Sequence, residues 1–187
     1  MEHLHSKNIL MGDINLLNIM IDPDGEVFFV DTDSYQIDHF PCPVGTQDFT
    51  SREIFLEDEK YKKETGKNRS YSQYLRTRDD EYFALAVLLF EILFFEKHPY
   101  ARQGGNSVKE NIVEMEFVYP PGEEGGEKVP IGPYIEIWNH LMPEAKQAFY
   151  DTFAKDGAHS RAGTRLDATR WKEIMKNYLD TLLFHSN

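Results

Sequence analysis

The sequence predicts a mainly α-helical domain that carries one small β-hairpin. The run YFALAVLLFEILFF at 82–95 is apolar on nearly every helical face, and a soluble helix of that kind is normally buried at the centre of its domain. The stretch NIMIDPDGEVFFVD places two β-rich runs on either side of Pro23-Asp24-Gly25, which is a strong turn signal. Helical periodicity recurs at 143–154 and at 166–184.

Composition and length are those of a folded domain. The 187 residues can bury a real core, and 41% hydrophobic with 13% aromatic content argues against a disordered chain. The net charge of −12 disfavours nucleic acid and anionic membranes as partners. The run at 82–95 contains Glu91 and is too short to cross a bilayer. Cys42 is the only cysteine, so no internal disulfide can form, and we expect a reducing, cytoplasmic location.

The first half of the chain is expected to contain the hairpin and several loops. Residues 1–6 have the composition of a helix end, and the hairpin covers 18–31. The polar stretch 32–50, with its prolines and glycine, predicts an ordered loop. A short helix is expected over TSREIFLED, and the highly charged residues 58–78 are interpreted as a surface excursion.

The second half is expected to be helical apart from one loop. The central helix should run from about 80 to about 96. Ser107 is a plausible N-cap for a short helix in SVKENIVEM, and residues rich in Pro and Gly predict a loop at 119–133. The terminal helices should occupy about 143–184. Pro143 suits the first turn of one, and Asp167 can cap the other.

Three polar residues surround the predicted hairpin. Asp13 and Asn18 lie on the loop that enters it, and Asp31 lies at its exit. Because a hairpin brings its ends together, Asn18 and Asp31 should face the same space. Carboxylate and carboxamide oxygens are suitable ligands for Mg²⁺, and a further Asp can accept or orient a hydroxyl proton. Any one of these residues alone is more often a turn residue, but the three together predict a phosphoryl-transfer site.

The chain resembles the C-terminal lobe of a protein kinase from residue 3 to about residue 180. Met11-Gly12-Asp13, with Asn18 five residues after Asp13, is similar to the catalytic loop of the family, at 11–18. Asp31-Thr32-Asp33 occupies the position of the D-F-G motif and begins an activation segment at 31–53. DDEYFALAVLLFEIL resembles the central helix of that lobe, with Glu81 where the family usually has Asp. The D-T-D motif is most similar to an atypical bacterial Ser/Thr kinase-like group.

The resemblance implies ATP and Mg²⁺ as cofactors and assigns roles to the loop residues. Asp13 would be the catalytic base, and Asn18 and Asp31 would hold the metal. Asp33 is a candidate extra metal ligand, although a turn-capping role is about as plausible on sequence grounds. Asn15 stands where the family has a catalytic Lys, so it can hydrogen bond a phosphate without adding positive charge.

Five further residues receive roles from the same resemblance. Met20 and Val30 would line the adenine pocket. Thr46 matches the Thr that lies near the catalytic Asp in Ser/Thr-directed kinases. Glu53, in Ser51-Arg52-Glu53, would pair with Arg165 as a structural ion pair.

Several departures from the family pattern affect this interpretation. Gly12 replaces the Arg that normally pairs with an activation-loop phosphate, so no such switch is expected. Thr32 and Asp33 replace the Phe and Gly of the D-F-G motif, so the packing switch based on that Phe is expected to be absent. No glycine-rich phosphate loop and no strand Lys precede Asp13, so the ATP-binding N-lobe is expected to be absent from these residues.

Three functions are therefore compatible with the sequence. The first is the C-lobe of a Ser/Thr protein kinase that phosphorylates protein hydroxyls when complete, with a protein substrate and an N-lobe supplied by a longer chain. On this hypothesis, these 187 residues alone are expected to lack full activity. The second is a pseudokinase-like module that binds a partner protein, which the departures favour. The third is a small-molecule kinase of the aminoglycoside or choline type, which also uses G-D-x-x-x-x-N and a later Asp-x-Asp. The segment VGTQDFTSRE and its partner Arg165 fit protein kinases better.

Overall fold

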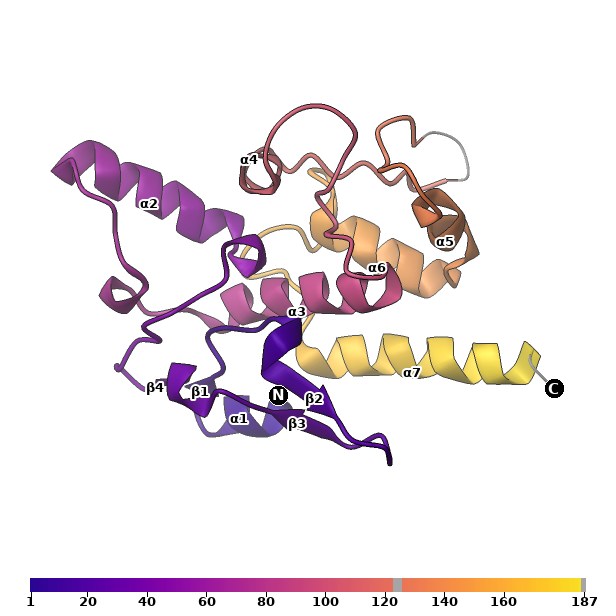
Figure 1. The fold of residues 1–187 in the computed structure, drawn as a ribbon, viewed down its shortest axis with the longest axis horizontal. Coiled ribbons are helices and arrows are strands. Elements are labelled where there is room, and N and C mark those ends of the chain that lie inside the picture. The colour runs from indigo at the N-terminus through magenta and orange to yellow at the C-terminus, as the bar shows by residue number, and fades with distance from the viewer. Residues whose placement is uncertain (123–125, 186–187) are drawn as a thin grey trace. The chain divides into compact units, whose positions relative to one another are not determined.

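The computed structural model describes residues 1–122 and 126–185. Within them the fold is mainly helical, with seven α-helices and short antiparallel strand pairs, which confirms the predicted mix of elements (Figure 1). The chain divides into two compact units, Met1–Leu88 and Leu89–Asn187.

The predicted hairpin is present in the first unit. Strands β2 (Ile19–Ile21) and β3 (Val27–Phe29) pair antiparallel, with Met20 opposite Phe28. The Asp22 carboxylate closes the turn because its Oδ1 accepts the backbone N–H groups of Asp24 and Glu26, both at 2.9 Å. Such local side-chain bonds are why Asp is favoured in turns.

A second strand pair was not predicted. After the helix α1 (Glu2–Ser6), strand β1 (Ile9–Leu10) pairs antiparallel with β4 (Gln36–Ile37), which lies in the predicted loop 32–50. The same stretch contains 3₁₀ turns at Thr32–Ser34 and Gln47–Phe49. Strands of two residues are too short to show any alternation of polar and apolar positions, so sequence patterns do not reveal them.

Two longer helices follow in the first unit. Helix α2 (Arg52–Thr65) is longer than the predicted helix and ends at Gly66, which has φ of 71° and donates its N–H to the Lys62 carbonyl at 2.9 Å. The start of the predicted excursion is thus helical. Helix α3 (Arg78–Leu93) begins near the predicted start but ends earlier, because Phe95 and Glu96 adopt positive φ of 51° and 61°.

The core of the first unit forms around the predicted catalytic loop. Met11 and Ile14, on either side of Asp13, are buried against Ala84 and Leu88 of α3. Partly buried apolar side chains pack on this cluster, among them Leu4, Leu16, Ile19, Phe29, Tyr35 and Phe49. The loop that carries Asp13 is therefore anchored by apolar packing on both sides.

The second unit contains the remaining helices, α4 (Val108–Glu114), α5 (Tyr134–His140), α6 (Pro143–Phe153) and α7 (Ala168–His185). Ser107 caps α4 through a capping box with Glu110, and the Asp167 Oδ1 accepts the Arg170 N–H at 2.8 Å. Both caps were predicted. Helix α5 was not predicted, because it is short and directly follows the Pro- and Gly-rich stretch.

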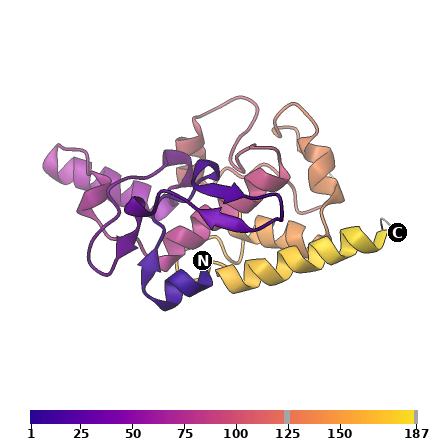
Figure 2. The same cartoon turned by 60° about the horizontal axis from the view of Figure 1, so that its bottom comes forward.

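Aromatic side chains fill the core of the second unit. Phe90 and Phe94 stack with ring centroids 3.9 Å apart, and the Trp138 indole N–H donates to the Pro120 carbonyl at 2.7 Å. Helices α6 and α7 lie side by side, joined by a 2.7 Å ion pair between Glu144 and Arg170 (Figure 2). No helix among the described residues has the length and apolar character needed to span a membrane.

Candidate active site

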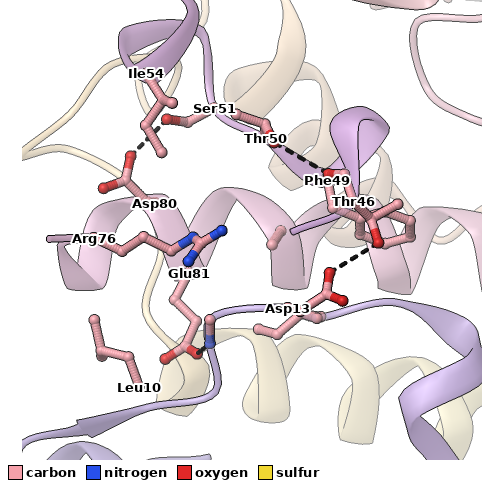
Figure 3. A pocket seen from close by; sticks show the side chains of 13 residues that line it. Leu10, Asp13, Thr46, Phe49, Thr50, Ser51, Ile54, Arg76, Asp80 and Glu81 are labelled. Carbon is pink, nitrogen blue, oxygen red and sulfur yellow. Dashed lines mark hydrogen bonds between the residues drawn. The ribbon is translucent and has the colours of Figure 1, made fainter. Parts of the chain in front are cut away.

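Asp13 and Thr46 are joined by a direct hydrogen bond. The Thr46 hydroxyl donates to the Asp13 Oδ1 at 2.8 Å, and both side chains line the pocket shown in Figure 3. Thr46 precedes the 3₁₀ turn at Gln47–Phe49, whose Phe49 N–H donates to the Thr46 carbonyl at 3.1 Å. The bond occupies one carboxylate oxygen of Asp13 and leaves Oδ2 as the second acceptor.

Two buried carboxamides hold the backbone of the same loop. The Asn18 Nδ2 donates to the Asp13 carbonyl at 2.8 Å, which leaves the Asn18 Oδ1 as the acceptor of that side chain. The Asn15 Nδ2 donates to the Thr46 hydroxyl at 3.2 Å, and its Oδ1 accepts the Leu17 N–H at 2.9 Å. Asn15 thus caps the 3₁₀ turn Leu16–Asn18, so both of its polar groups are engaged within the chain.

Asp31 lies at the exit of the hairpin, next to the loop. The Val30 N–H donates to the Asn18 carbonyl at 3.0 Å, which links the two ends of the hairpin. The pKa of the Asp31 carboxyl is raised above its usual range, because the Asp33 side chain hydrogen bonds to it and adds like charge. Burial and the negative charge of Asp13 raise it further. Negative charge is therefore concentrated at this end of the hairpin.

The D-T-D motif has a tightly turned backbone. Asp31 is left-handed, with φ of 62° and ψ of 48°, and the 3₁₀ turn Thr32–Ser34 follows it. The buried Ser34 hydroxyl lies 2.9 Å from the Asp31 carbonyl and 3.3 Å from the Met11 carbonyl, so its single hydrogen is shared between these two acceptors. Ser34 therefore attaches the motif to the loop that carries Asp13.

Glu81 of α3 accepts hydrogen bonds from the backbone of the Asp13 loop. Its buried carboxylate accepts the Met11 N–H in a short hydrogen bond and the Gly12 N–H at 3.2 Å. The other carboxylate oxygen pairs with the ring of His5, which is also buried. These bonds satisfy loop donors that would otherwise be buried without an acceptor.

Gly12 is required by the space and the backbone at its position. Its φ is +77°, and a Cβ there would lie 2.6 Å from the Cys42 Cβ and 2.9 Å from the Ser34 carbonyl. Any larger residue would strain the backbone and displace Cys42. The absence of Arg at this position, which the sequence showed as a departure from the family pattern, thus has a local packing reason.

A small pocket lies between the loop and the predicted activation segment. Figure 3 shows the Arg76 guanidinium pointing into it, opposite Asp13 and Thr46. On another wall the Ser51 hydroxyl donates to the Asp80 Oδ1 at 2.5 Å. Apolar side chains complete the lining, namely Leu10, Ile14, Phe49, Ile54 and Ala84. The predicted activation segment is therefore bonded to α3 and the Asp13 loop across this pocket.

The predicted adenine-lining residues lie on or beside the hairpin. Met20 is 59% exposed and stands opposite Phe28, which is also exposed, while Val30 is half-buried. Glu53 lies in the first turn of α2, and Arg165 is buried in the second unit. The pairing of these two residues stays a prediction.

The side chains around Asp31 suit a hard cation. The Asp33 side chain raises the pKa of the Asp31 carboxyl through a hydrogen bond and its like charge, so these two residues form a site of excess negative charge. The Asn18 Oδ1 remains as a neutral acceptor oxygen on the Asp13 loop. Within residues 1–122 and 126–185 no three His, Cys, Asp or Glu side chains are grouped as a metal site. The predicted set of Asn18, Asp31 and Asp33 contains two carboxylates and one amide.

Sequence reasoning missed three residues that shape the site. His5 and Ser34 had no predicted role, and Arg76 was placed in a surface excursion although it is buried. Their contacts span large sequence separations, as with the 2.8 Å bond from the Gln36 Nε2 to the Arg76 carbonyl. In the sequence, the glycine at position 45 was the one hint of a close approach. The structure shows that a Cβ there would lie 2.4 Å from the Arg76 Nη2.

Two known proteins that are similar to this chain are named as protein kinases. No protein-family model matches the chain. It is 27% identical to "Protein kinase YegI" of Escherichia coli O157:H7 over 179 residues, which is 90% of this chain and 25% of that protein. It is 29% identical to the protein of the same name from E. coli strain K12 over 165 residues, 82% of this chain and 23% of that protein. The chain thus spans about a quarter of the length of these curated relatives, and the similarity supports a kinase-like relationship.

Proposed function

We propose that this chain carries the catalytic-loop lobe of an atypical Ser/Thr protein kinase. The observation that carries the proposal is the hydrogen-bonded group of Asp13, Thr46, Asn15 and Asn18. Thr46 holds one oxygen of Asp13, so the other is directed to accept a hydroxyl proton from a protein acceptor. A protein substrate is therefore the proposed partner, and the cytoplasm is the proposed location.

The proposed cofactors are ATP and Mg²⁺. Asn18 and Asp31, with Asp33 beside them, would hold Mg²⁺, because their oxygens and excess negative charge suit a hard cation. The metal, when bound with ATP, supplies charge neutralisation on the phosphates. Val30 and the exposed Met20 would contact the adenine. The ATP-binding lobe of the family would be supplied by further parts of a longer protein.

One observation favours a second candidate, a binding module without catalysis. Asn15 replaces the phosphate-contacting Lys of the family, and its amide is engaged with Thr46 and the Leu17 N–H. It is therefore not directed at a phosphate, and the site lacks that positive charge. A small-molecule kinase is favoured less, because the bond between Thr46 and Asp13 comes from the segment that resembles protein kinases.

Binding of Mg·ATP tests the metal assignment. Isothermal calorimetry is expected to show binding that requires Mg²⁺, and Asp31→Asn should weaken it by at least about tenfold, because a ligand carboxylate is lost. Asn tolerates the left-handed backbone of Asp31, so the substitution leaves the turn intact.

Asp38→Asn is the matched control. Asp38 is also left-handed, with φ of 49°, and it is exposed. We expect its affinity for Mg·ATP to equal that of the unmodified chain. Equal weakening in both variants, or equal binding with and without Mg²⁺, would contradict the metal assignment. No binding at all would favour the binding module.

Thr46→Val tests whether the hydroxyl bonded to Asp13 serves catalysis. The change removes Oγ1 and frees Asp13 to rotate, so phosphate transfer should fall by about 10- to 100-fold. Thr46→Ser, which keeps the hydroxyl, should retain most activity. Thr50→Val is the control, because it removes a 3.1 Å hydroxyl bond to the Thr46 carbonyl but none to Asp13. Equal losses in Thr46→Val and Thr50→Val would reduce Thr46 to a structural role.

A further inference from the structure

The end of the segment between α2 and α3 is bonded to residues 36–46. The Arg76 N–H donates to the Gln36 Oε1 at 2.8 Å, and the Gln36 Nε2 donates back to the Arg76 carbonyl at 2.8 Å. Gln36 and Arg76 are only 6% and 9% exposed. This reciprocal, buried pair joins two stretches that lie 40 residues apart in the sequence.

The Arg76 guanidinium reaches the backbone just before Thr46. Its Nη2 donates to the Val44 carbonyl at 2.7 Å, and its Nη1 donates to the Cys42 carbonyl at 3.5 Å. A Cβ at Gly45 would lie 2.4 Å from Nη2, so only glycine permits this approach. Charged donors to carbonyls make strong hydrogen bonds, particularly where water is excluded.

Aromatic rings fix the side chain of Arg76 from the same segment. The guanidinium carbon lies 5.1 Å from the ring centroid of Tyr71 and 5.7 Å from that of Tyr74. Arg69 also lies over Tyr74, with its guanidinium carbon 4.3 Å from the ring centroid, and pairs with Asp58 at 2.7 Å. Arg76 is thus held in one orientation by its own neighbours.

We propose that residues 71–76 form a built-in clamp on the predicted activation segment, with Arg76 as the positioning residue that sets Thr46 against Asp13. The effect of the clamp on phosphate transfer rests on the proposed function. The clamp itself rests on contacts within the first unit. The clamp needs no added phosphate, because the positive charge that meets the segment is already part of the chain. The segment is therefore constitutively ordered.

Hydrogen exchange measured by mass spectrometry tests the clamp. In Arg76→Gln, the amides of a peptide covering 44–50 should exchange at least about tenfold faster, because local opening becomes easier. This peptide includes the Phe49 N–H, which donates to the Thr46 carbonyl. Arg69→Gln is the matched control, since Arg69 also lies over Tyr74 but pairs with Glu57 and Asp58 instead of the segment. Unchanged exchange in Arg76→Gln, or the same increase in both variants, would overturn the proposal.

Gly45→Ala gives an independent route that keeps Arg76. The added methyl group must displace the guanidinium, so the same peptide should exchange faster. In the double variant with Arg76→Gln the increase in exchange should be smaller than the sum of the two single effects, because both substitutions disrupt the same packing of residues 71–76 around Gly45. If Arg76→Gln does not fold, Gly45→Ala decides alone, and unchanged exchange would overturn the clamp.

Phosphate transfer gives the functional readout. Arg76→Gln should lower kcat by about 10- to 100-fold while the KM for Mg·ATP stays unchanged, because Arg76 contacts none of the proposed nucleotide-binding residues. A rise in the KM for Mg·ATP with unchanged kcat would contradict a positioning role. Absence of transfer in the unmodified protein would remove the proposed function but leave the exchange result standing.

Discussion

Asp13→Asn is expected to reduce phosphate transfer to a protein hydroxyl by about 10²- to 10⁴-fold, the range for loss of a general base. The amide keeps the size of the side chain and can still accept from Thr46, so the loop should stay folded. What is lost is the oxygen that accepts the proton of the acceptor hydroxyl. The measurement is transfer of labelled phosphate from Mg·ATP to a Ser/Thr acceptor protein, made with a longer protein that includes the ATP-binding lobe.

Asp24→Asn is the control for this experiment. Asp24 lies in the exposed turn of the hairpin, where Asn is equally suitable. Its activity should equal that of the unmodified protein. Unchanged transfer in Asp13→Asn would remove Asp13 from the reaction, and with it the kinase proposal. Calorimetry on the same variant should still show Mg·ATP binding, because Asp13 is not a proposed metal ligand.

Glu81→Ala is expected to have the largest effect on stability. It leaves the N–H groups of Met11 and Gly12, and the His5 ring, without their acceptor. Each buried donor left unsatisfied costs about 1–3 kcal/mol, so the free energy of unfolding should fall by about 3 kcal/mol or more. Urea unfolding followed by circular dichroism measures the loss.

Two further variants show whether loss of the Glu81 carboxylate acceptor causes the drop in the free energy of unfolding. Glu81→Gln keeps one oxygen for the loop N–H groups, so its loss should be clearly smaller than that of Glu81→Ala. Glu59→Ala removes an exposed helical carboxylate and should change stability by less than about 0.5 kcal/mol. Equal losses in Glu81→Ala and Glu81→Gln would mean that packing, and not the acceptor oxygen, decides the stability of the loop.

The hairpin turn and the helix caps could be predicted from the sequence because their hydrogen bonds join residues that are close in the chain. The hairpin follows from Asp22-Pro23-Asp24-Gly25 between β-rich runs, since the Asp22 carboxylate and the Asp22 backbone both hydrogen bond within the turn. The starts of α4 and α7 follow from caps at Ser107 and Asp167, each within three residues of its partner. In all of these cases the interacting groups are neighbours in the chain, so residue type and spacing are sufficient.

The sequence by itself therefore determined the helical class, the hairpin and the identity of Asp13, Asn18 and Asp31 as candidate site residues. Only the tertiary structure decided what supports them. The Thr46 bond to Asp13 spans 33 residues, and the bond from Gly12 to Glu81 spans 69. Such contacts leave no periodic trace in a single sequence, because they depend on how α3 and the buried Arg76 bring distant backbone segments together. The physical reason is that tertiary packing brings these distant groups together, and their hydrogen bonds are stronger where that packing excludes water.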